Sequence, residues 1–121
     1  AMTGEIKPQL DLDGFRIRAE RIRVARAEAG KEVTEEGIKE AEAEHMYRKL
    51  KAEALSHYRT KEEMGVTEAE IMAEGHERVV DAKRDRNLAQ LLRRSAEERC
   101  AELDRNASML NREAQMSRGI E

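Results

Sequence analysis

Glu42 and His45 are the two side chains whose types and spacing most clearly suggest a chemical role, because they form the motif Glu-x-x-His. Di-iron proteins built as helical bundles use this spacing, because it directs a carboxylate and an imidazole to the same metal. Such a site needs a second copy of the motif and two further inward glutamates. His76 has Ala73 three residues before it, so the second copy is missing. We therefore interpret the histidines as solvated or capping side chains, and we expect no metal and no cofactor.

The single cysteine, Cys100, lies between Ala96 and Leu103 on an apolar helix face. A buried and inert thiol is commoner at such a position than a reactive one. The sequence also has no Gly-rich phosphate loop, no Cys-x-x-Cys pair and no Ser/His/Asp signature. We therefore expect that the chain is not an enzyme. One cysteine excludes an internal disulfide and fits a reducing compartment.

Arginine-rich segments are the second place where the sequence could bind a ligand. The segments FRIRAERIRVARA and KRDRNLAQLLRR offer side chains for nucleic-acid phosphates, with Arg16, Arg18, Arg21, Arg23, Arg26, Arg84, Arg93 and Arg94 as candidate contacts. Acidic residues are interspersed, and aromatic residues for base stacking are few. An acidic block at 32–44 follows the basic block at 16–26, so the alternative is ion pairing between helices or between subunits. We favour ion pairs and keep nucleic-acid binding as the alternative.

The composition predicts one small all-α domain. The chain has 121 residues, of which 40% are charged and 2% aromatic, with one proline and no tryptophan. Ala, Glu, Arg and Leu dominate, and these residues favour helices, whereas few β-branched and aromatic residues are present to build a sheet. No apolar run approaches a membrane span and no signal peptide is visible, so we expect a cytoplasmic protein with no membrane contact. The net charge of -3 gives no global attraction to nucleic acid.

Two similar stretches, VTEEGI from Val33 and VTEAEI from Val66, have the pattern of helix starts. Thr34 and Thr67 are at the N-cap position of the pattern, each after an apolar residue. Gly30 and Gly65 precede them, where glycines commonly end helices. The signals predict helices at about 13–29, 34–64 and 67–117, a flexible N-terminal arm at 1–11, and a single helical domain over 12–121. Gly75 could split the third helix, and the sequence does not decide whether it does.

The helix lengths predict an elongated antiparallel hairpin, a coiled-coil-like bundle of three helices in which the third runs back along the other two. The third helix carries a stripe of Ala82, Ala89, Ala96, Cys100, Leu103, Ala107, Leu110 and Ala114, with Leu88, Leu91 and Leu92 widening it. For the second helix the pattern gives a face of Ile38, Ala41, Met46, Leu50, Ala54, Tyr58 and Met64.

The first helix is apolar on two flanks, with Phe15 and Ile22 on one side and Ile17 and Val24 on the other. A rod two helices thick cannot cover both flanks, so we expect self-association, with a dimer as the default. The predicted core or oligomer seam is Phe15, Ile22, Leu88, Leu92, Cys100, Leu103 and Leu110. We expect Phe15 and Ile22 to meet Leu103 and Leu110, in the same subunit or in a second one.

The run from Tyr47 to Leu92 resembles uncharacterised small helical proteins of tailed phages, especially those of actinobacterial hosts. The features that carry the resemblance are Tyr58-Arg59, the helix start from Val66 to Ile71, and an AExHxxVxxAK-like run that ends at Lys83. The use of 16 arginines against 7 lysines suits a GC-rich genome. The resemblance implies a phage-encoded protein in the host cytoplasm, with a possible host protein partner. It implies no activity and no site residues. The missing catalytic motifs, the long amphipathic helices and the segregated charge lead us to expect a self-associating interaction or scaffolding protein.

Overall fold

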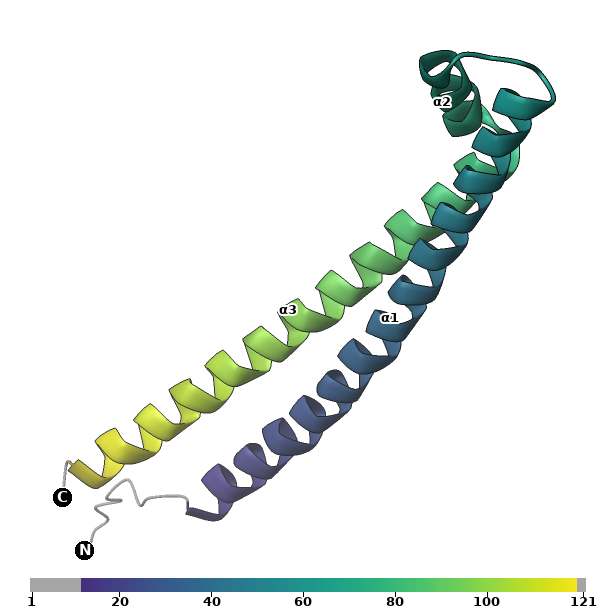
Figure 1. Ribbon diagram of the computed structural model, residues 1–121. Coiled ribbons are helices and arrows are strands. Elements are labelled where there is room, and N and C mark those ends of the chain that lie inside the picture. The colour runs from purple at the N-terminus through teal and green to yellow at the C-terminus, as the bar shows by residue number, and fades with distance from the viewer. Residues whose placement is uncertain (1–11, 120–121) are drawn as a thin grey trace, which may run out of the picture.

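The computed structural model describes residues 12–119, which form three α-helices and no strand. Helix α1 spans Leu12–Thr60, α2 spans Val66–Gly75 and α3 spans Glu77–Gly119. Figure 1 shows α1 and α3 running antiparallel along one another, with α2 folded across the end at which they are joined. The predicted all-α antiparallel hairpin is confirmed. The predicted arm at 1–11 lies outside the described residues.

The helix boundary predicted at Gly30 is wrong, because α1 continues unbroken from Leu12 to Thr60. Thr34 does not cap a new helix; its Oγ1 donates a hydrogen bond to the carbonyl oxygen of Gly30, one turn back, at 3.3 Å. A mid-helix glycine costs about 1 kcal/mol relative to alanine. Packing against α3 offsets that cost here, since the neighbouring Ala29 is almost fully buried and Arg26 on the preceding turn pairs with Asp104 of α3.

The predicted cap at Thr67 is also wrong, as is the predicted helix end at Gly65. The chain leaves α1 at Thr60, and Gly65 is itself the N-cap of α2, with no side-chain capping bond. The left-handed backbone conformation between these helices belongs to Glu63, with φ of 54°, and not to a glycine. Backbone bonds near the end of α1 fold the chain tightly, including one from the Met64 N–H to the Tyr58 carbonyl at 3.0 Å.

Gly75 does end the helix that Val66 begins. His76 follows it in an extended conformation, and its N–H donates to the Ala73 carbonyl at 3.2 Å. The imidazole Nδ1 of His76 accepts a hydrogen bond from the Arg78 N–H at 3.3 Å, so this side chain caps the start of α3. The interpretation of the histidines as solvated or capping residues is confirmed at His76.

The predicted stripe on α3 packs against α1. Apart from Gln90, the buried or half-buried positions of α3 recur at alternating intervals of three and four residues, which is the pattern of a coiled-coil seam: 79, 82, 86, 89, 93, 96, 100, 103, 107, 110, 114 and 117. Most of these residues are small. We call this set the inner stripe.

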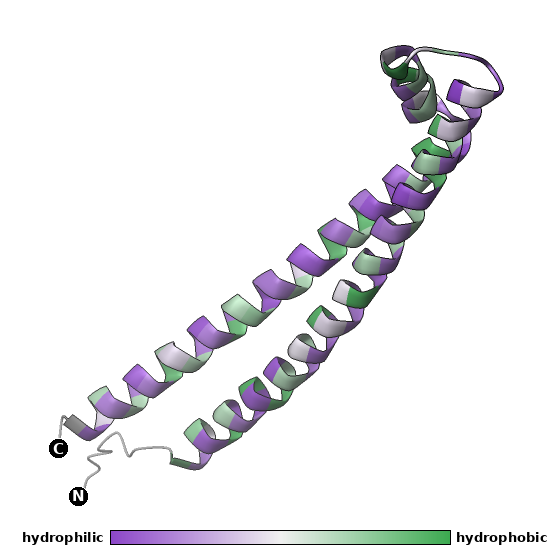
Figure 2. Cartoon of the chain, in the orientation of Figure 1, coloured by the Kyte–Doolittle hydropathy of each residue, from purple (hydrophilic) through white to green (hydrophobic). Residues whose placement is uncertain are grey.

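The face predicted for residues 34–64 is wrong in part. Ile38 and Met46 are 56% and 48% exposed, and Ala41 is exposed as well. The face of α1 that meets α3 instead runs through positions 22, 26, 29, 33, 36, 40, 43, 47, 50 and 54. It includes Glu36 and Glu40, whose charges made it resemble a solvated surface in the sequence. Figure 2 shows the resulting mixture of hydrophilic and hydrophobic residues along both long helices.

A cluster of buried apolar side chains lies where the three helices meet. Tyr47, Ala54, Ala73, Val79 and Ala82 form it. Ala69 and Ala73 of α2 are fully buried, which lets this short helix lie close to its neighbours. The two ends of the hairpin therefore differ from each other in their packing. Three helices pack together at the α2 end, and two helices at the end that carries Leu12 and Gly119.

Replacing the most buried leucine of the inner stripe should destabilise the hairpin. Leu110 is 8% exposed, and we expect Leu110→Ala to cost about 2–4 kcal/mol through lost burial and the cavity left behind. The neighbouring Met109 is 59% exposed, so Met109→Ala should change the stability little. Denaturant melts of both variants at one protein concentration provide the measurement. Equal losses for the two variants would show that the seam is misplaced.

Removing the glycines inside α1 should stabilise the protein. An added Cβ at Gly37 meets no atom within 4 Å, so Gly37→Ala should gain about 0.5–1 kcal/mol. At Gly30 the added Cβ would lie 3.0 Å from a guanidinium nitrogen of Arg26, and the gain there should be smaller. Chemical denaturation of the two variants tests the continuous helix. A loss of stability in both variants would mean that α1 is broken near these residues.

Candidate interaction surface

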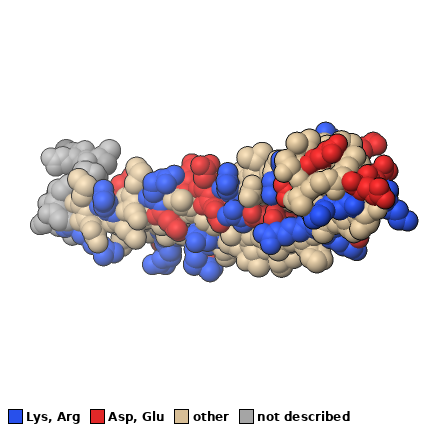
Figure 3. Space-filling model, turned by 45° about the horizontal axis from the view of Figure 1, so that its top comes forward, with Lys and Arg blue, Asp and Glu red and all other residues tan. Residues whose placement is uncertain are grey.

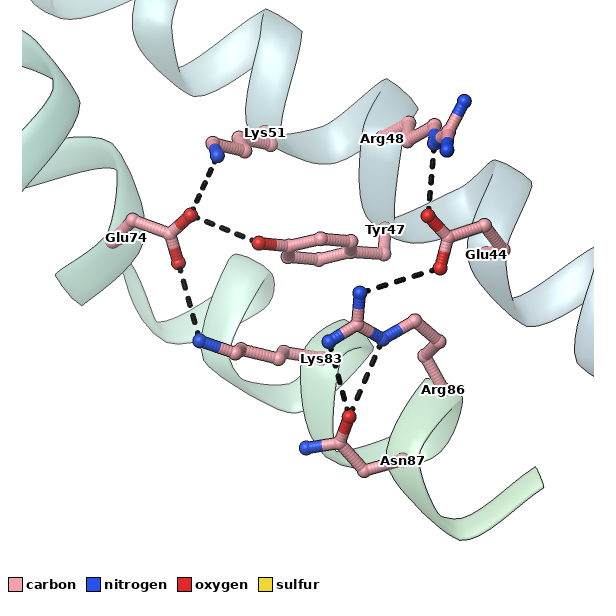
Figure 4. Close-up of polar contacts among 8 residues, drawn as sticks. All are labelled: Glu44, Tyr47, Arg48, Lys51, Glu74, Lys83, Arg86 and Asn87. Carbon is pink, nitrogen blue, oxygen red and sulfur yellow. Dashed lines mark hydrogen bonds and ion pairs between the residues drawn. The ribbon is translucent and has the colours of Figure 1, made fainter. Parts of the chain in front are cut away.

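Side chains from all three helices meet around Tyr47 (Figure 4). The Tyr47 hydroxyl donates a hydrogen bond to Oε1 of Glu74 on α2 at 2.9 Å. Lys51 of α1 lies 2.7 Å from the same carboxylate, and Lys83 of α3 lies 3.8 Å from its other oxygen. A single α2 carboxylate therefore connects α2 to both long helices. We call these four residues the Tyr47 cluster.

A guanidinium covers the ring of Tyr47. Arg86 of α3 lies 4.7 Å from the ring centroid, within the range of a cation–π contact. The same guanidinium is 3.3 Å from Glu44 of α1, which also pairs with Arg48 at 2.8 Å. Arg86 additionally donates to Oδ1 of Asn87 at 3.1 Å. Tyr47 is thus held at its hydroxyl and on its ring face, and it is only 8% exposed.

The cluster shifts the proton affinities of its members. The hydrogen bond from Lys51, followed by the one from Tyr47, lowers the pKa of Glu74 below its ordinary value of 4.5. The hydrogen bond to Glu74 in turn raises the pKa of Lys51. Burial, and then the bond to Glu74, raises the pKa of Tyr47. The shifts of Glu74 and Lys51 both favour the charged forms present at neutral pH, so this ion pair stabilises the folded chain.

Ion pairs join α1 to α3 along the rest of the hairpin. Up to Arg26, α1 supplies the arginine, as in Arg18 with Glu113 at 3.6 Å and Arg26 with Asp104 at 2.9 Å. From Glu32 onward α1 supplies the acid, as in Glu32 with Arg99 and Glu40 with Arg93. The basic and acidic blocks of the sequence therefore face their opposites in the antiparallel register. Figure 3 shows both signs of charge interspersed along one side of the rod.

Most of the arginines predicted to contact nucleic acid have acidic neighbours. Arg23 pairs with Glu20 within α1, and Arg84 lies 3.8 Å from Asp81 within α3. Arg18, Arg26 and Arg93 make the inter-helix pairs described above. Three of the predicted contacts have no ion pair among residues 12–119: Arg16, Arg21 and Arg94. Nucleic-acid binding stays a prediction.

The predicted apolar residues divide into two groups. Cys100 is 7% exposed, and Ile22, Leu103 and Leu110 line one hollow of about 210 Å³ between α1 and α3. Phe15 is half-buried, and the Arg18 guanidinium lies over its ring, 4.8 Å from the ring centroid. The second group is Leu88 and Leu92, which are 55% and 47% exposed. They are not part of the core of the single chain, and their place in an oligomer seam stays a prediction.

Within the described part of the chain, the histidines and acidic residues do not gather into a metal centre. Glu42 and His45 are both exposed. His57 and His76 line a hollow of about 160 Å³ at the α2 end, and the ring of Tyr58 meets both edge-on, at 5.3 and 6.3 Å. Among residues 12–119, no group of three or more His, Cys, Asp or Glu side chains is placed to hold a metal ion.

The Tyr47 cluster was not predicted from the sequence. The spacing of Tyr47 and Lys51, and of Glu44 and Arg48, places each pair on adjacent turns of one helix, which is the only local signal. Glu74 joins them because α2 folds back after Thr60, and the sequence left open whether Gly75 splits the helix predicted at about 67–117. The cluster depends on that fold.

No protein-family model matches the chain, and searches of curated proteins and of solved structures also find no match. Within residues 12–119, no helix combines the length and the apolar character needed to cross a bilayer.

Breaking the Tyr47 cluster should weaken the protein at neutral pH. Tyr47→Phe keeps the ring but removes the bond to Glu74, and we expect a loss of about 0.5–1.5 kcal/mol. Glu74→Gln should also destabilise, because Lys51 and Lys83 lose their carboxylate. Since the folded pKa of Glu74 is lowered, its contribution is present above pH 4.5 and is lost as the pH falls through the folded value. The difference in melting temperature between the wild type and Glu74→Gln should therefore shrink on acidification. A difference that stays constant from neutral to strongly acidic pH would contradict this role.

Proposed function

We propose that the chain is a non-enzymatic helical interaction or scaffolding protein that associates with itself through its long helices. The observation that supports this most is the exposure of large apolar side chains on a thin rod. Those at least 38% exposed are Leu12, Ile17, Val24, Ile38, Met46, Val66, Ile71, Met72, Val80, Leu88, Leu91, Leu92, Met109 and Met116. By contrast, the buried positions are mostly alanine.

The exposed surface is large for the mass of the chain. It amounts to 9303 Å² for 13.9 kDa. The scaling of surface with mass gives about 6,700 Å² for a compact monomer of this size. A dimer interface of ordinary size buries roughly 800 Å² on each partner. The rod therefore offers enough surface for such an interface, and burying large apolar side chains would supply the free energy that the alanine seam does not.

The ionisable side chains support a structural use of charge. The Tyr47 cluster and the inter-helix pairs fix α1, α2 and α3 to one another. Our proposal assigns this chain no catalytic residues and no cofactor. The resemblance of residues 47–92 to small helical phage proteins supports a phage origin, with action in the host cytoplasm and a possible host protein partner. Pull-down from an actinobacterial host lysate is the direct search for that partner.

Self-association is the testable core of this proposal. We expect far-ultraviolet circular dichroism to give a mainly helical spectrum, and sedimentation equilibrium at micromolar concentration to give a mass of two chains or more. The association should persist at high salt, because apolar burial drives it and salt screens mainly the charges. A monomer across the micromolar range, or a spectrum with little helix, would contradict the proposal.

A further inference from the structure

A second stripe of regularly spaced residues runs along α3 beside the inner stripe. It lies one residue earlier at each step, so it is turned by about 100° around the helix. The intervals again alternate between three and four, and every member is exposed: Arg78, Asp81, Asp85, Leu88, Leu92, Ser95, Arg99 and Glu102. We call this set the outer stripe. Its two leucines are at its centre, and charged residues occupy both ends.

Ion pairs show which side of the hairpin carries the outer stripe. Arg99 pairs with Glu32, and Glu113, two heptads further along α3, pairs with Arg18, two heptads earlier on α1. On α1, the position two heptads after Glu32 is Met46, which lies on the same side of the helix and is 48% exposed. On α3, the position one heptad before Arg99 is Leu92, which likewise lies on the same side as Arg99. Met46 and the two leucines thus lie on the same side of the hairpin and give the stripe an apolar centre.

When the outer stripe is reversed, its charges are complementary at two of the three charged steps, and at the third Asp85 lies opposite the neutral Ser95. If Leu88 lies opposite Leu92 of an antiparallel second copy, Asp81 lies opposite Arg99 of that copy. At the next step Arg78 lies opposite Glu102. Parallel pairing in register would instead place each of these charges opposite its own like. Building on the self-association proposed above, we propose that the outer stripe binds a second copy of this chain, α3 against α3, in antiparallel orientation about a two-fold axis between Leu88 and Leu92.

The outer stripe has the composition of a two-fold interface. Its apolar centre is bordered by charged residues, as in protein interfaces with an apolar core and a polar rim. The span from Arg78 to Glu102 is about 36 Å of helix. A symmetric dimer uses the same surface on both copies, and a self-complementary order of charges meets that requirement. The second copy places α3 next to α3, which completes a four-helix cross-section.

Charge reversal tests the antiparallel register. Arg78 and Glu102 suit this test because neither side chain makes an ion pair within residues 12–119. In the dimer each single reversal, Arg78→Glu or Glu102→Arg, places like charges opposite one another twice. We expect each to weaken dimerisation about tenfold at low ionic strength, and the double reversal to restore the wild-type Kd to within about threefold. Sedimentation equilibrium measures the Kd, and thermal melts confirm the fold. A double variant no tighter than either single variant would overturn the register.

Removing the leucines tests the surface itself. The double variant Leu88→Ser with Leu92→Ser should weaken dimerisation by about a hundredfold or more, with its helix content unchanged. The matched control is Ile17→Ser, since Ile17 is 52% exposed but adjoins Arg18, whose partner Glu113 lies beyond the outer stripe. Ile17→Ser should leave the Kd unchanged.

The outcomes separate this inference from the proposed function. A wild type that self-associates but tolerates the double serine variant would overturn the outer stripe as the interface, and the proposed function would stand. A wild type that is monomeric throughout the micromolar range would overturn both.

Discussion

The close approach of α1 and α3 along small residues determines the geometry of the remaining structure. Ala29, Ala89 and Ala96 are among the most buried side chains of the two long helices. Alanine permits a short distance between helix axes but buries little apolar area, so the seam fixes the orientation of the helices more than it stabilises them. Long charged side chains reach across the alanine seam between α1 and α3, and the ion pairs that flank the seam are consistent with one antiparallel register. The larger apolar side chains have no room in such a seam and remain outside it.

The α2 end has a different construction because a third helix contributes. Val79 has no exposed surface there, and the phenol of Tyr47 fills the space between the helices. Tyr47 is a large side chain at a seam position, and its hydroxyl would be costly to bury without a partner. Glu74 supplies the acceptor from α2. One aromatic residue therefore couples the packing of the hairpin to the position of the short helix.

The sequence predicted the helix class, the antiparallel topology and the α3 side of the seam, because alternating intervals of three and four residues appear directly in the order of Ala, Cys and Leu. It did not predict where helices end. The residues next to Gly30 in the sequence predict a helix end there. Contacts with α3, such as the ion pair of Arg26 with Asp104, instead hold α1 as one continuous helix. On α1 the inner face includes Glu36 and Glu40, and charged residues at such half-buried positions interrupt the hydrophobic pattern from which a buried face is predicted. The sequence assigned Leu88 and Leu92 to a core or oligomer seam without deciding between the two, and their exposure excludes them from the core of the single chain.

The position of the Tyr47 cluster also bears on how the hairpin closes. Tyr47 and Glu74 are 27 residues apart in the chain, whereas Arg26 and Asp104 are 78 apart. The entropy cost of closing a loop rises with the logarithm of its length, which makes the more distant contact about 0.9 kcal/mol harder to form from an open chain. Once the Tyr47 cluster is in place, each further turn of α3 needs only to pair with the next turn of α1. The contacts between α1 and α3 then form in order from the α2 end toward Leu12 and Gly119, and the helices separate first at the end that carries Leu12 and Gly119.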